Sequence, residues 1–356
     1  MSSAASSASP IVRAIARALD QRDLSRDEMA EVVGQIMDGQ ATAAQIGGFL
    51  VALRGKGESV DELVGAALAM RARATPLAHP ALERSIDTCG TGGDGAGTIN
   101  VSTIAAILIA ARGGVVAKHG NRALSSKCGS ADVLEALGIA VDAEPAVVER
   151  CMAAANIGFA FAPKFHAATR HVGPARRELG TRTVFNLLGP LTNPANVRHQ
   201  VVGVYARAWC EPVAAALGGL GLRRAAVVHG AGNLDELAVA GETHVALWTG
   251  ERVESFALSP RDFGLADVDP AGLAGGDVAY NARVIEDVLA ERDTGGGQRL
   301  QAALHAAGMT AALGLELLEP DFDRARLPDQ YATATATLRG GRARATFTAW
   351  REASRS

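Results

Sequence analysis

Cysteines and aromatic residues are scarce in this sequence of 356 residues. The four cysteines, Cys89, Cys128, Cys151 and Cys210, are widely spaced and form no CxxC pair, so the sequence indicates neither a disulfide framework nor a cysteine zinc site. No secretory signal is recognisable at the start, and we expect a cytoplasmic protein. Aromatic residues make up 4% and hydrophobic residues 48%, which predicts a sizeable core with closely packed helices.

Positive charge and long apolar runs are lacking as well. The formal net charge is −3, whereas nucleic-acid-binding domains usually carry a basic excess, so we expect no nucleic-acid partner. No apolar run approaches membrane-spanning length, so we expect no membrane contact. The chain is long enough for one large domain and a smaller one.

Helix start signals dominate the first part of the chain. Three capping boxes pair a hydroxyl side chain with an acid or amide three residues later: Ser25 with Glu28, Thr42 with Gln45, and Ser59 with Glu62. Gly39 and Gly55 are candidate helix stops. We predict a disordered tail over residues 1–9 and a helical domain over residues 10–80. This domain either serves only packing and dimer formation or also lines a substrate cleft.

From Ile86 onward, short β-rich runs alternate with helical runs. Such alternation predicts an α/β fold with a mainly parallel central sheet flanked by helices. Two β-rich runs joined through Gly250 predict a hairpin at one edge of the sheet. We assign residues 81–356 to this domain. Segment 169–195 is a candidate for packing against the smaller, all-helical N-terminal domain.

The stretch from Asp87 to Asn100 reads DTCGTGGDGAGTIN, with a predicted strand before it and a predicted helix after it. Its five glycines are Gly90, Gly92, Gly93, Gly95 and Gly97. Glycine permits positive φ and lets a ligand approach the backbone, and the start of a helix presents unpaired N–H groups. We expect this stretch to bind an anion, most often a phosphate.

The same stretch contains the GxGxxG pattern of dinucleotide-binding proteins, at Gly90, Gly92 and Gly95. That fingerprint needs an acid about 20 residues later to bind the ribose hydroxyls. No acid lies between Asp94 and Asp132, so we reject a nicotinamide site. Asp94 would repel phosphate unless a metal ion or sugar hydroxyls lie between them. A sugar phosphate with a divalent metal is therefore the better hypothesis.

A basic segment follows the next predicted strand. All charged residues between Asp94 and Asp132 are positive, and Lys118 and Arg122 are candidates for binding phosphate. Ser130 begins the predicted helix behind this segment, whose N-terminus would make a second anion site. The plainer alternative is an ordinary N-cap serine.

An adjacent acid pair, Asp235 and Glu236, ends a loop that begins at His229 after another predicted strand. Ligands of open α/β sheets bind at the carboxyl ends of strands. Two acids there can hold Mg²⁺, which shares its coordination with substrate phosphates. The alternative is a solvated turn.

Four arginines crowd one segment: Arg170, Arg176, Arg177 and Arg182. A guanidinium is the favoured partner of a carboxylate. On a helix, Arg176 and Arg177 point to different faces, so at most one of them faces a cleft. The alternative for most of the four is surface pairing with Glu178.

Six motifs follow one another along the chain: DTCGTGGD from Asp87, NVST from Asn100, KHGNR from Lys118, GSADVLEALG from Gly129, RTVFNLLGPLTNPA from Arg182 and HGAGNLDE from His229. Together they resemble the anthranilate phosphoribosyltransferase family of tryptophan biosynthesis, which shares its fold with nucleoside phosphorylases. The resemblance extends from the helical N-terminus to about Ala307. It implies a homodimer formed through the helical domain, with the substrates meeting at the hinge between the two domains.

The resemblance also implies the site residues. Phosphoribosyl pyrophosphate would be surrounded by Gly90, Gly93, Asp94, Thr98, Asn100, Ser102, Thr103, Lys118, Asn121, Ser126 and Ser130. Anthranilate would contact Gly90, His119, Asn121, His166, Arg176, Gly189 and Pro190. Magnesium, with two ions expected, would be bound by Ser102, Asp235 and Glu236.

The implied reaction is attack of the anthranilate amine on the anomeric carbon as pyrophosphate leaves. No acid–base catalyst is assigned, because an aryl amine is already uncharged at neutral pH. Two alternatives stay open. A pyrimidine nucleoside phosphorylase shares the architecture and a GTGGD loop, but is expected to carry a KxSGR motif where this chain has KHGNR. A non-catalytic nucleic-acid-binding relative is expected to lack the pair Asp235 and Glu236 and to have a basic surface.

Overall fold

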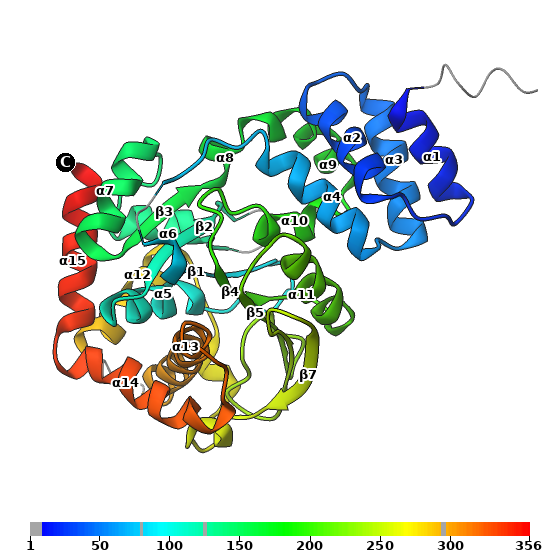
Figure 1. Ribbon diagram of the computed structural model, residues 1–356. Helices are drawn as coiled ribbons and strands as arrows, with labels where there is room; N and C mark the ends of the chain where they lie inside the picture. Colours follow the sequence, from blue (N-terminus) through cyan, green and yellow to red (C-terminus); the bar gives the residue numbers. More distant parts are fainter. Residues whose placement is uncertain (1–8, 79–80, 124–126, 293–296) are drawn as a thin grey trace, which may run out of the picture.

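The computed structural model describes residues 9–78, 81–123, 127–292 and 297–356. The predicted tail, apart from Ser9, and Ser126 of the predicted donor site lie outside these ranges. A group of helices stands at one end of the molecule, and an α/β part built around a seven-stranded sheet forms the rest (Figure 1). The predicted fold class is confirmed.

The N-terminal part contains α1 (Pro10–Leu19), α2 (Arg26–Met37), α3 (Ala43–Lys56) and α4 (Val60–Arg71). The three predicted capping boxes are present: the hydroxyls of Ser25, Thr42 and Ser59 each accept from the backbone N–H three residues later. Gly55 was expected to stop α3, and this prediction is wrong. The helix continues to Lys56 and ends at Gly57, whose φ of 91° suits glycine.

Glu62 connects several segments of this helical part from the inside. Its fully buried carboxylate accepts from the N–H groups of Leu24 at 2.9 Å and Ser59 at 2.7 Å, and from Lys56 Nζ at 2.9 Å. The starts of α2 and α4 and the end of α3 therefore meet at one buried ion pair.

The sheet has the strand order β3-β2-β1-β4-β5-β6-β7. The strands are β1 (Ser85–Gly90), β2 (Val115–Gly120), β3 (Ile157–Phe161), β4 (His199–Gly203), β5 (Arg224–Gly230), β6 (Thr243–Trp248) and β7 (Val253–Leu258). Strands β1 to β5 pair in parallel, whereas β6 and β7 are the antiparallel edge hairpin. Strand β4 is buried along its whole length, as expected where helices cover both faces of a parallel sheet.

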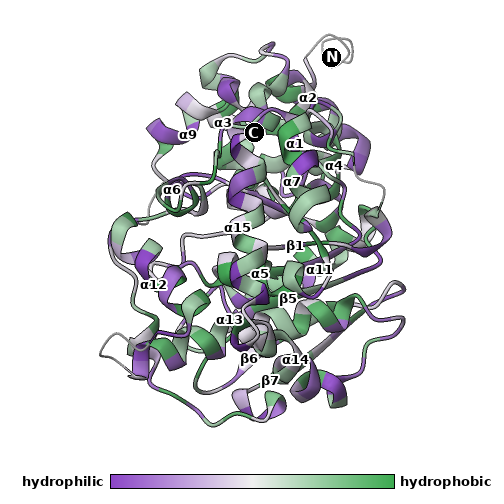
Figure 2. Cartoon of the chain, turned by 90° about the vertical axis from the view of Figure 1, so that its left-hand side faces the viewer, coloured by the Kyte–Doolittle hydropathy of each residue, from purple (hydrophilic) through white to green (hydrophobic). Residues whose placement is uncertain are grey.

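Successive residues of the strands point to opposite faces of the sheet. Val202 and Val227 pack with α4 and α11 (Cys210–Gly219), whereas Val201 and Val228 pack with the larger group of helices. That group comprises α5 (Val101–Ala111), α6 (Ser130–Ala136), α7 (Pro145–Ala155), α12 (Val278–Ala290), α13 (Gly297–Leu317), α14 (Leu327–Arg339) and α15 (Arg342–Arg355). Outer helices such as α12 carry both polar and apolar residues (Figure 2). None of the described helices is long and apolar enough to cross a bilayer.

The chain between β3 and β4 returns to the helical part. It forms α8 (Ala162–Phe165), α9 (Gly173–Leu179) and α10 (Phe185–Leu191). Val172 and Phe185 belong to the same apolar cluster as Met29 and Phe49, and α9 contacts α3 while α10 contacts α4. The segment therefore joins the two parts of the molecule. The domain boundary near residue 80 stays a prediction.

Strands β1 and β4 are neighbours in the sheet although β2 and β3 lie between them in the chain. The strand order reverses its direction there. Ligands of open α/β sheets bind in the crevice at such a point, outside the carboxyl ends of the strands. The glycine stretch begins at this end of β1, so the topology directs attention to it.

Replacing Glu62 by alanine should lower the free energy of unfolding by about 3–5 kcal/mol, because Lys56 and the N–H of Leu24 lose a buried partner. Urea unfolding followed by circular dichroism measures the loss. Glu28→Ala is the matched control: it removes the equivalent capping-box acid, which is 44% exposed, and should cost about 1 kcal/mol. Equal losses in the two variants would contradict the role given to the buried pair.

Candidate active site

The glycine stretch forms a loop between β1 and α5, called here the glycine loop (residues 90–100). Four of its glycines have φ between 60° and 80°: Gly92, Gly93, Gly95 and Gly97. Other residues rarely adopt this conformation. The N–H of Thr91 donates to the carbonyl of Gly203 at 2.9 Å, and the N–H of Tyr205 donates to the Thr91 hydroxyl at 3.0 Å. The loop is thus anchored to β4 across the crevice.

Asp235 lies directly against the glycine loop. Its Oδ2 accepts from the N–H of Gly92 at 2.7 Å, and its own N–H donates to Asp94 Oδ2 at 3.3 Å. A Cβ on Gly203 would stand 1.5 Å from the carbonyl oxygen of Asp235, so glycine is required for this approach. The fold therefore brings together two acids that are far apart in the sequence.

Burial raises the pKa of Asp235 to about 7, and the charge of Asp94 adds to the shift. Burial also raises the pKa of Glu236 well above its ordinary value, with a contribution from the charge of Asp235. Acids with raised pKa values, gathered in a crevice, are typical of functional sites. Added positive charge would favour their ionised forms.

Lys118 is the cation beneath these acids. It is 1% exposed, and its Nζ donates to the carbonyl of Thr88 at 2.6 Å and to Ser102 Oγ at 3.1 Å. Its charge opposes the effect of burial on the pKa of Glu236 and on that of Asp87, which burial raises to about 6. One ammonium cannot balance both acids together with Asp94 and Asp235.

Asp235 and Glu236 are suited to bind a metal ion whose remaining ligands come from a substrate. No group of three or more His, Cys, Asp or Glu side chains in the described part of the chain is arranged to hold a metal by itself. Asp235 and Glu236 provide two carboxylates, and the N–H of Ser102 interacts with Glu236 at the start of α5. Mg²⁺ keeps several waters and takes further oxygens from phosphates. This donor set fits Mg²⁺ together with a phosphorylated ligand.

A cavity of about 230 Å³, called here the acceptor cavity, opens beside the glycine loop. It is lined by all the residues predicted for anthranilate: Gly90, His119, Asn121, His166, Arg176, Gly189 and Pro190. Thr91 also lines it, so the glycine loop forms part of its wall. Met70 of α4 lines it too, so the helical part contributes to this cavity as well as to packing.

Two neutral histidines line the acceptor cavity. His119 Nδ1 lies 3.1 Å from the carbonyl oxygen of Gly189, so Nδ1 carries the proton and Nε2 is left as an acceptor. The Nε2 atoms of His119 and His166 are buried and have no hydrogen-bond partner within the described ranges. Burial lowers the pKa of His119 to about 3 and that of His166 to about 4, so both rings are uncharged near neutral pH. The acceptor cavity is therefore lined by uncharged imidazole rings.

Arg176 provides the positive charge of the acceptor cavity. Its guanidinium lies 5.5 Å from the ring centroid of Phe185 and has no carboxylate partner among the described residues. Burial lowers its pKa. Arg177 is exposed, which agrees with the predicted divergence of the two side chains. A half-buried guanidinium that no carboxylate of the described residues pairs with is suited to a carboxylate ligand.

Of the other residues predicted for the donor, Thr98 and Asn100 lie in the last part of the glycine loop. Thr98 forms an isolated bridge with Ala274, and Asn100 Oδ1 accepts from Asn281 Nδ2 at 3.1 Å. The hydroxyl of Ser130 donates to the carbonyl of Asn121 at 3.4 Å. Thr103 is fully buried in α5. Sequence reasoning missed Asn281, which lies on a distant helix outside every recognised motif.

Arg122 is less available than the sequence suggested. Its guanidinium pairs with Asp132 at 3.0 Å and with Glu135 at 2.8 Å, so its charge is neutralised locally. Asp132 also accepts from the N–H groups of Ala123 and Gly129, each at 2.9 Å. The predicted second anion site at the start of α6 therefore already has a carboxylate on the N–H of its N-cap residue, Gly129.

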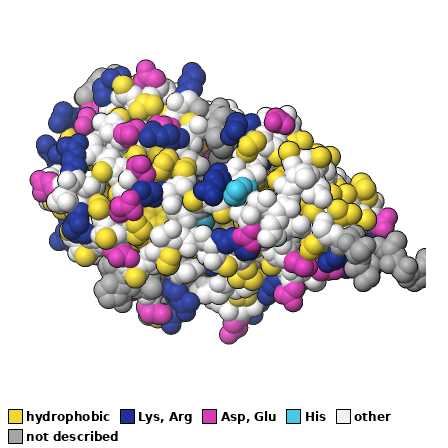
Figure 3. Space-filling view, turned by 90° about the horizontal axis from the view of Figure 1, so that it is seen from above, with side chains coloured by type: hydrophobic (Ala, Val, Ile, Leu, Met, Phe, Trp, Pro, Cys, Tyr) yellow, Lys and Arg dark blue, Asp and Glu magenta, His cyan; other side chains and the backbone are white. Residues whose placement is uncertain are grey.

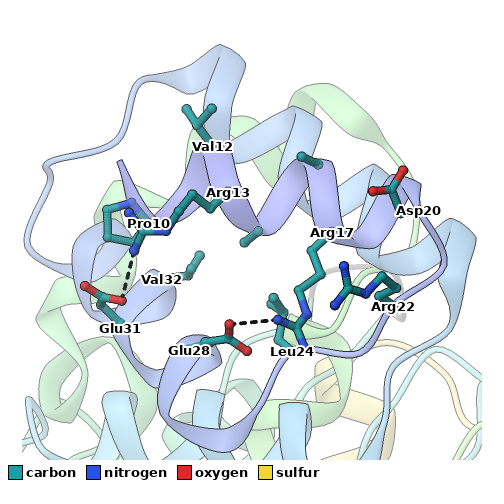
Figure 4. Close-up of a pocket in the computed structure, with 12 residues that line it drawn as sticks. Pro10, Val12, Arg13, Arg17, Asp20, Arg22, Leu24, Glu28, Glu31 and Val32 are labelled. Atoms are coloured by element: carbon teal, nitrogen blue, oxygen red, sulfur yellow. Dashed lines mark hydrogen bonds and ion pairs between the residues drawn. The ribbon is translucent and has the colours of Figure 1, made fainter. Parts of the chain in front are cut away.

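A further cavity, of about 420 Å³, lies in the helical part beside α1 and α2 (Figure 4). Ion pairs join Arg17 to Glu28 at 3.0 Å and Arg13 to Glu31 at 3.6 Å among its lining residues. These arginines are already paired, and the cavity does not adjoin the glycine loop. It is therefore a weaker candidate for the substrate site.

Family models match both parts of the chain. Residues 12–74 match the helical bundle domain of a glycosyl transferase family, and residues 82–343 match the a/b domain of a glycosyl transferase family. An anthranilate phosphoribosyltransferase from an Anaeromyxobacter species is 50% identical over 341 residues, which cover 93% of this chain and 99% of that protein. The enzyme of that name from Rhizobium meliloti is 54% identical over 275 residues, which cover 77% of this chain and 81% of that protein.

Solved structures agree with these matches. The crystal structure of anthranilate phosphoribosyltransferase from Thermus thermophilus superimposes with a TM-score of 0.87 at 38% identity, covering 96% of this chain and 99% of that one. The Saccharomyces cerevisiae enzyme in complex with PRPP and Mg gives a TM-score of 0.86 at 26% identity, covering 99% of both chains. With this fold, this site and these relatives, the chain belongs to the anthranilate phosphoribosyltransferase family of glycosyl transferases.

Proposed function

We propose that this protein transfers the phosphoribosyl group from phosphoribosyl pyrophosphate to the amine of anthranilate, giving phosphoribosyl anthranilate and pyrophosphate. The observation that carries this proposal is the shared wall: Gly90 and Thr91 belong both to the glycine loop and to the acceptor cavity. A donor on the loop and an aromatic amine in the cavity would be adjacent, which turns a bimolecular encounter into a positioned reaction. Relatives about half identical in sequence bear the name of this activity.

The glycine loop and the start of α5 form the donor side. Backbone N–H groups of the glycines and of the first turn of α5 would bind phosphate oxygens. Lys118 would stabilise their charge from below, held by Thr88 and Ser102. Mg²⁺ held by Ser102, Asp235 and Glu236 would offset the charge that develops on the leaving pyrophosphate. That two ions bind stays a prediction.

The acceptor cavity would orient anthranilate by its carboxylate. Arg176 would bind the carboxylate through a bidentate pair. The uncharged rings of His119 and His166 place no positive charge beside the aryl amine, which is itself uncharged at neutral pH. The amine therefore keeps the lone pair that attacks the anomeric carbon, and no protein base is needed. This chain's contribution is positioning and electrostatic stabilisation.

Product analysis tests the proposed reaction. With phosphoribosyl pyrophosphate, Mg²⁺ and anthranilate, mass spectrometry should find phosphoribosyl anthranilate and pyrophosphate in equal amounts. Thymidine with inorganic phosphate should release no thymine. Thymine release in the absence of any anthranilate-dependent pyrophosphate would instead support a pyrimidine nucleoside phosphorylase.

The helical part also supports a homodimer, as the family resemblance implies. The exposed large apolar residues of the described chain lie there: Val12, Leu19, Val51 and Leu68. Leu19, 66% exposed, and Val51, 50% exposed, line a groove between α1 and α3 together with Gly47 and Gly48. Apolar residues are prominent on the helical end of the molecule (Figure 3). Exposed apolar patches of this kind mark interaction sites.

The cytoplasmic location stays a prediction.

Replacing Asp235 by asparagine and Glu236 by glutamine together should lower kcat by a factor of about 10² or more, because the metal and the leaving group lose their carboxylates. Turnover measured over a range of Mg²⁺ concentrations detects this loss. The double variant should be no less stable to heat than the parent, since burial disfavours both ionised carboxylates. The exposed acid Glu242 provides the control Glu242→Gln, which should leave turnover unchanged. Full activity of the double variant would refute the metal assignment.

Arg176→Ala should raise the KM for anthranilate by about 10-fold or more, because a charge-assisted hydrogen bond to the carboxylate is lost. The KM for phosphoribosyl pyrophosphate should change by less than about 2-fold. Steady-state kinetics with each substrate varied in turn separates the two effects. Arg177→Ala, in the adjacent exposed position, is the control. Equal increases in both KM values would count against a role in binding anthranilate.

Val51→Glu should convert the proposed dimer into a monomer, because it places a charge in the apolar groove between α1 and α3. Sedimentation velocity measures the molecular mass in solution. Leu68→Glu is the matched control, since Leu68 is 42% exposed on α4 and does not line the groove. A Val51→Glu variant with the mass of the parent dimer would exclude this interface.

A further inference from the structure

Arg182 contacts the glycine loop and does not line the acceptor cavity. It belongs to the connection from α9, which carries Arg176, to α10, which begins at Phe185. Its Nη2 donates to the carbonyl of Gly93 in the glycine loop. It has no carboxylate partner within the described ranges. Arg182 thus connects the segment that carries the acceptor cavity to the loop assigned to the donor.

The guanidinium of Arg182 packs on the ring of Tyr205. The guanidinium of Arg182 lies 4.2 Å from the centroid of the Tyr205 ring, which is within the range of a cation–π contact. Tyr205 is 7% exposed, and its N–H donates to the hydroxyl of Thr91 in the same loop. Its own hydroxyl is buried and has no hydrogen-bond partner among the described residues. The ring face, rather than the hydroxyl, is therefore what Tyr205 contributes.

The glycine loop needs such support. Its glycines have large conformational freedom, so holding the backbone N–H groups toward a phosphate costs entropy. Asp235 holds the loop from one side through Gly92, and Arg182 holds it from the other through Gly93. Contacts that order a loop before the ligand arrives increase affinity without touching the ligand.

We propose that Arg182, stacked on Tyr205, is a positioning residue that fixes the glycine loop for the phosphoribosyl donor. This inference rests on the proposed function, in which that loop binds the donor. Arg182 acts through its planar shape and its hydrogen bond to Gly93, not through a direct charge contact with phosphate. Lysine has the charge but neither the plane nor the fork of donors, so it cannot replace arginine here.

Steady-state kinetics of five variants tests this role. Arg182→Ala should raise the KM for phosphoribosyl pyrophosphate by about 10-fold, and the KM for anthranilate by less than about 2-fold. Arg182→Lys should give nearly the same increase as alanine. Tyr205→Leu, which removes the ring, should reproduce the increase, whereas Tyr205→Phe, which keeps the ring face, should retain the parent value. Arg177→Ala is the control for loss of an arginine from the same segment.

Two results would overturn the inference. The first is recovery of the parent KM in Arg182→Lys together with an unaffected Tyr205→Leu, which would indicate a direct charge contact with the donor. The second is an unchanged donor KM in Arg182→Ala. If either truncated variant fails to fold, Arg182→Lys decides: a raised donor KM supports the inference, and the parent KM overturns it. Both results require an active parent protein, whereas an inactive parent would instead overturn the proposed function itself.

Discussion

An excess of partly buried negative charge at the carboxyl ends of the central strands is the constraint on which this site depends. Asp94, Asp235 and Glu236 gather around the glycine loop, and the ammonium of Lys118 cannot balance them. Burial raises the pKa values of Asp235 and Glu236, and neighbouring negative charges add to both shifts. Phosphate alone would add to the repulsion, and a metal alone would lack oxygens to complete its coordination. A metal together with a phosphorylated sugar removes the repulsion and completes the coordination of the metal. The acids are therefore expected to bind the metal only in company with the donor.

The sheet topology places these acids next to the acceptor cavity, which is lined by Arg176 and uncharged histidines. The strand order reverses between β1 and β4, so the glycine loop lies over the crevice and the carboxyl end of β4 supports it through Gly203 and Tyr205. On the other side of the loop, the segment from α8 to α10 bends back to the helical part and brings Arg176 and His166 to the acceptor cavity. The donor side carries Lys118 and the acids, whereas the acceptor cavity carries Arg176 and uncharged histidines. The two sites share the wall formed by Gly90 and Thr91.

Local features of this molecule could be predicted from the sequence, and contacts between distant residues could not. The capping boxes at Ser25, Thr42 and Ser59 followed from short patterns that act within one turn of helix. The end of α3 was misplaced by two residues because Gly55 can remain helical while Gly57 takes the positive φ. The neutralisation of Arg122 by Asp132 and Glu135, and the support of Asn100 by Asn281, depend on side-chain directions that no local pattern specifies. The acceptor residues were assembled by resemblance, and the fold brings them into one cavity.

The central claim is that this chain joins an aromatic amine to an activated sugar phosphate, and one progress curve tests it most directly. Purified protein is mixed with anthranilate, phosphoribosyl pyrophosphate and Mg²⁺, and the fluorescence of anthranilate is followed with time. The account predicts a loss of fluorescence whose rate is proportional to protein concentration and which ceases when the sugar phosphate or Mg²⁺ is omitted. Constant fluorescence with all components present and the protein folded would contradict it.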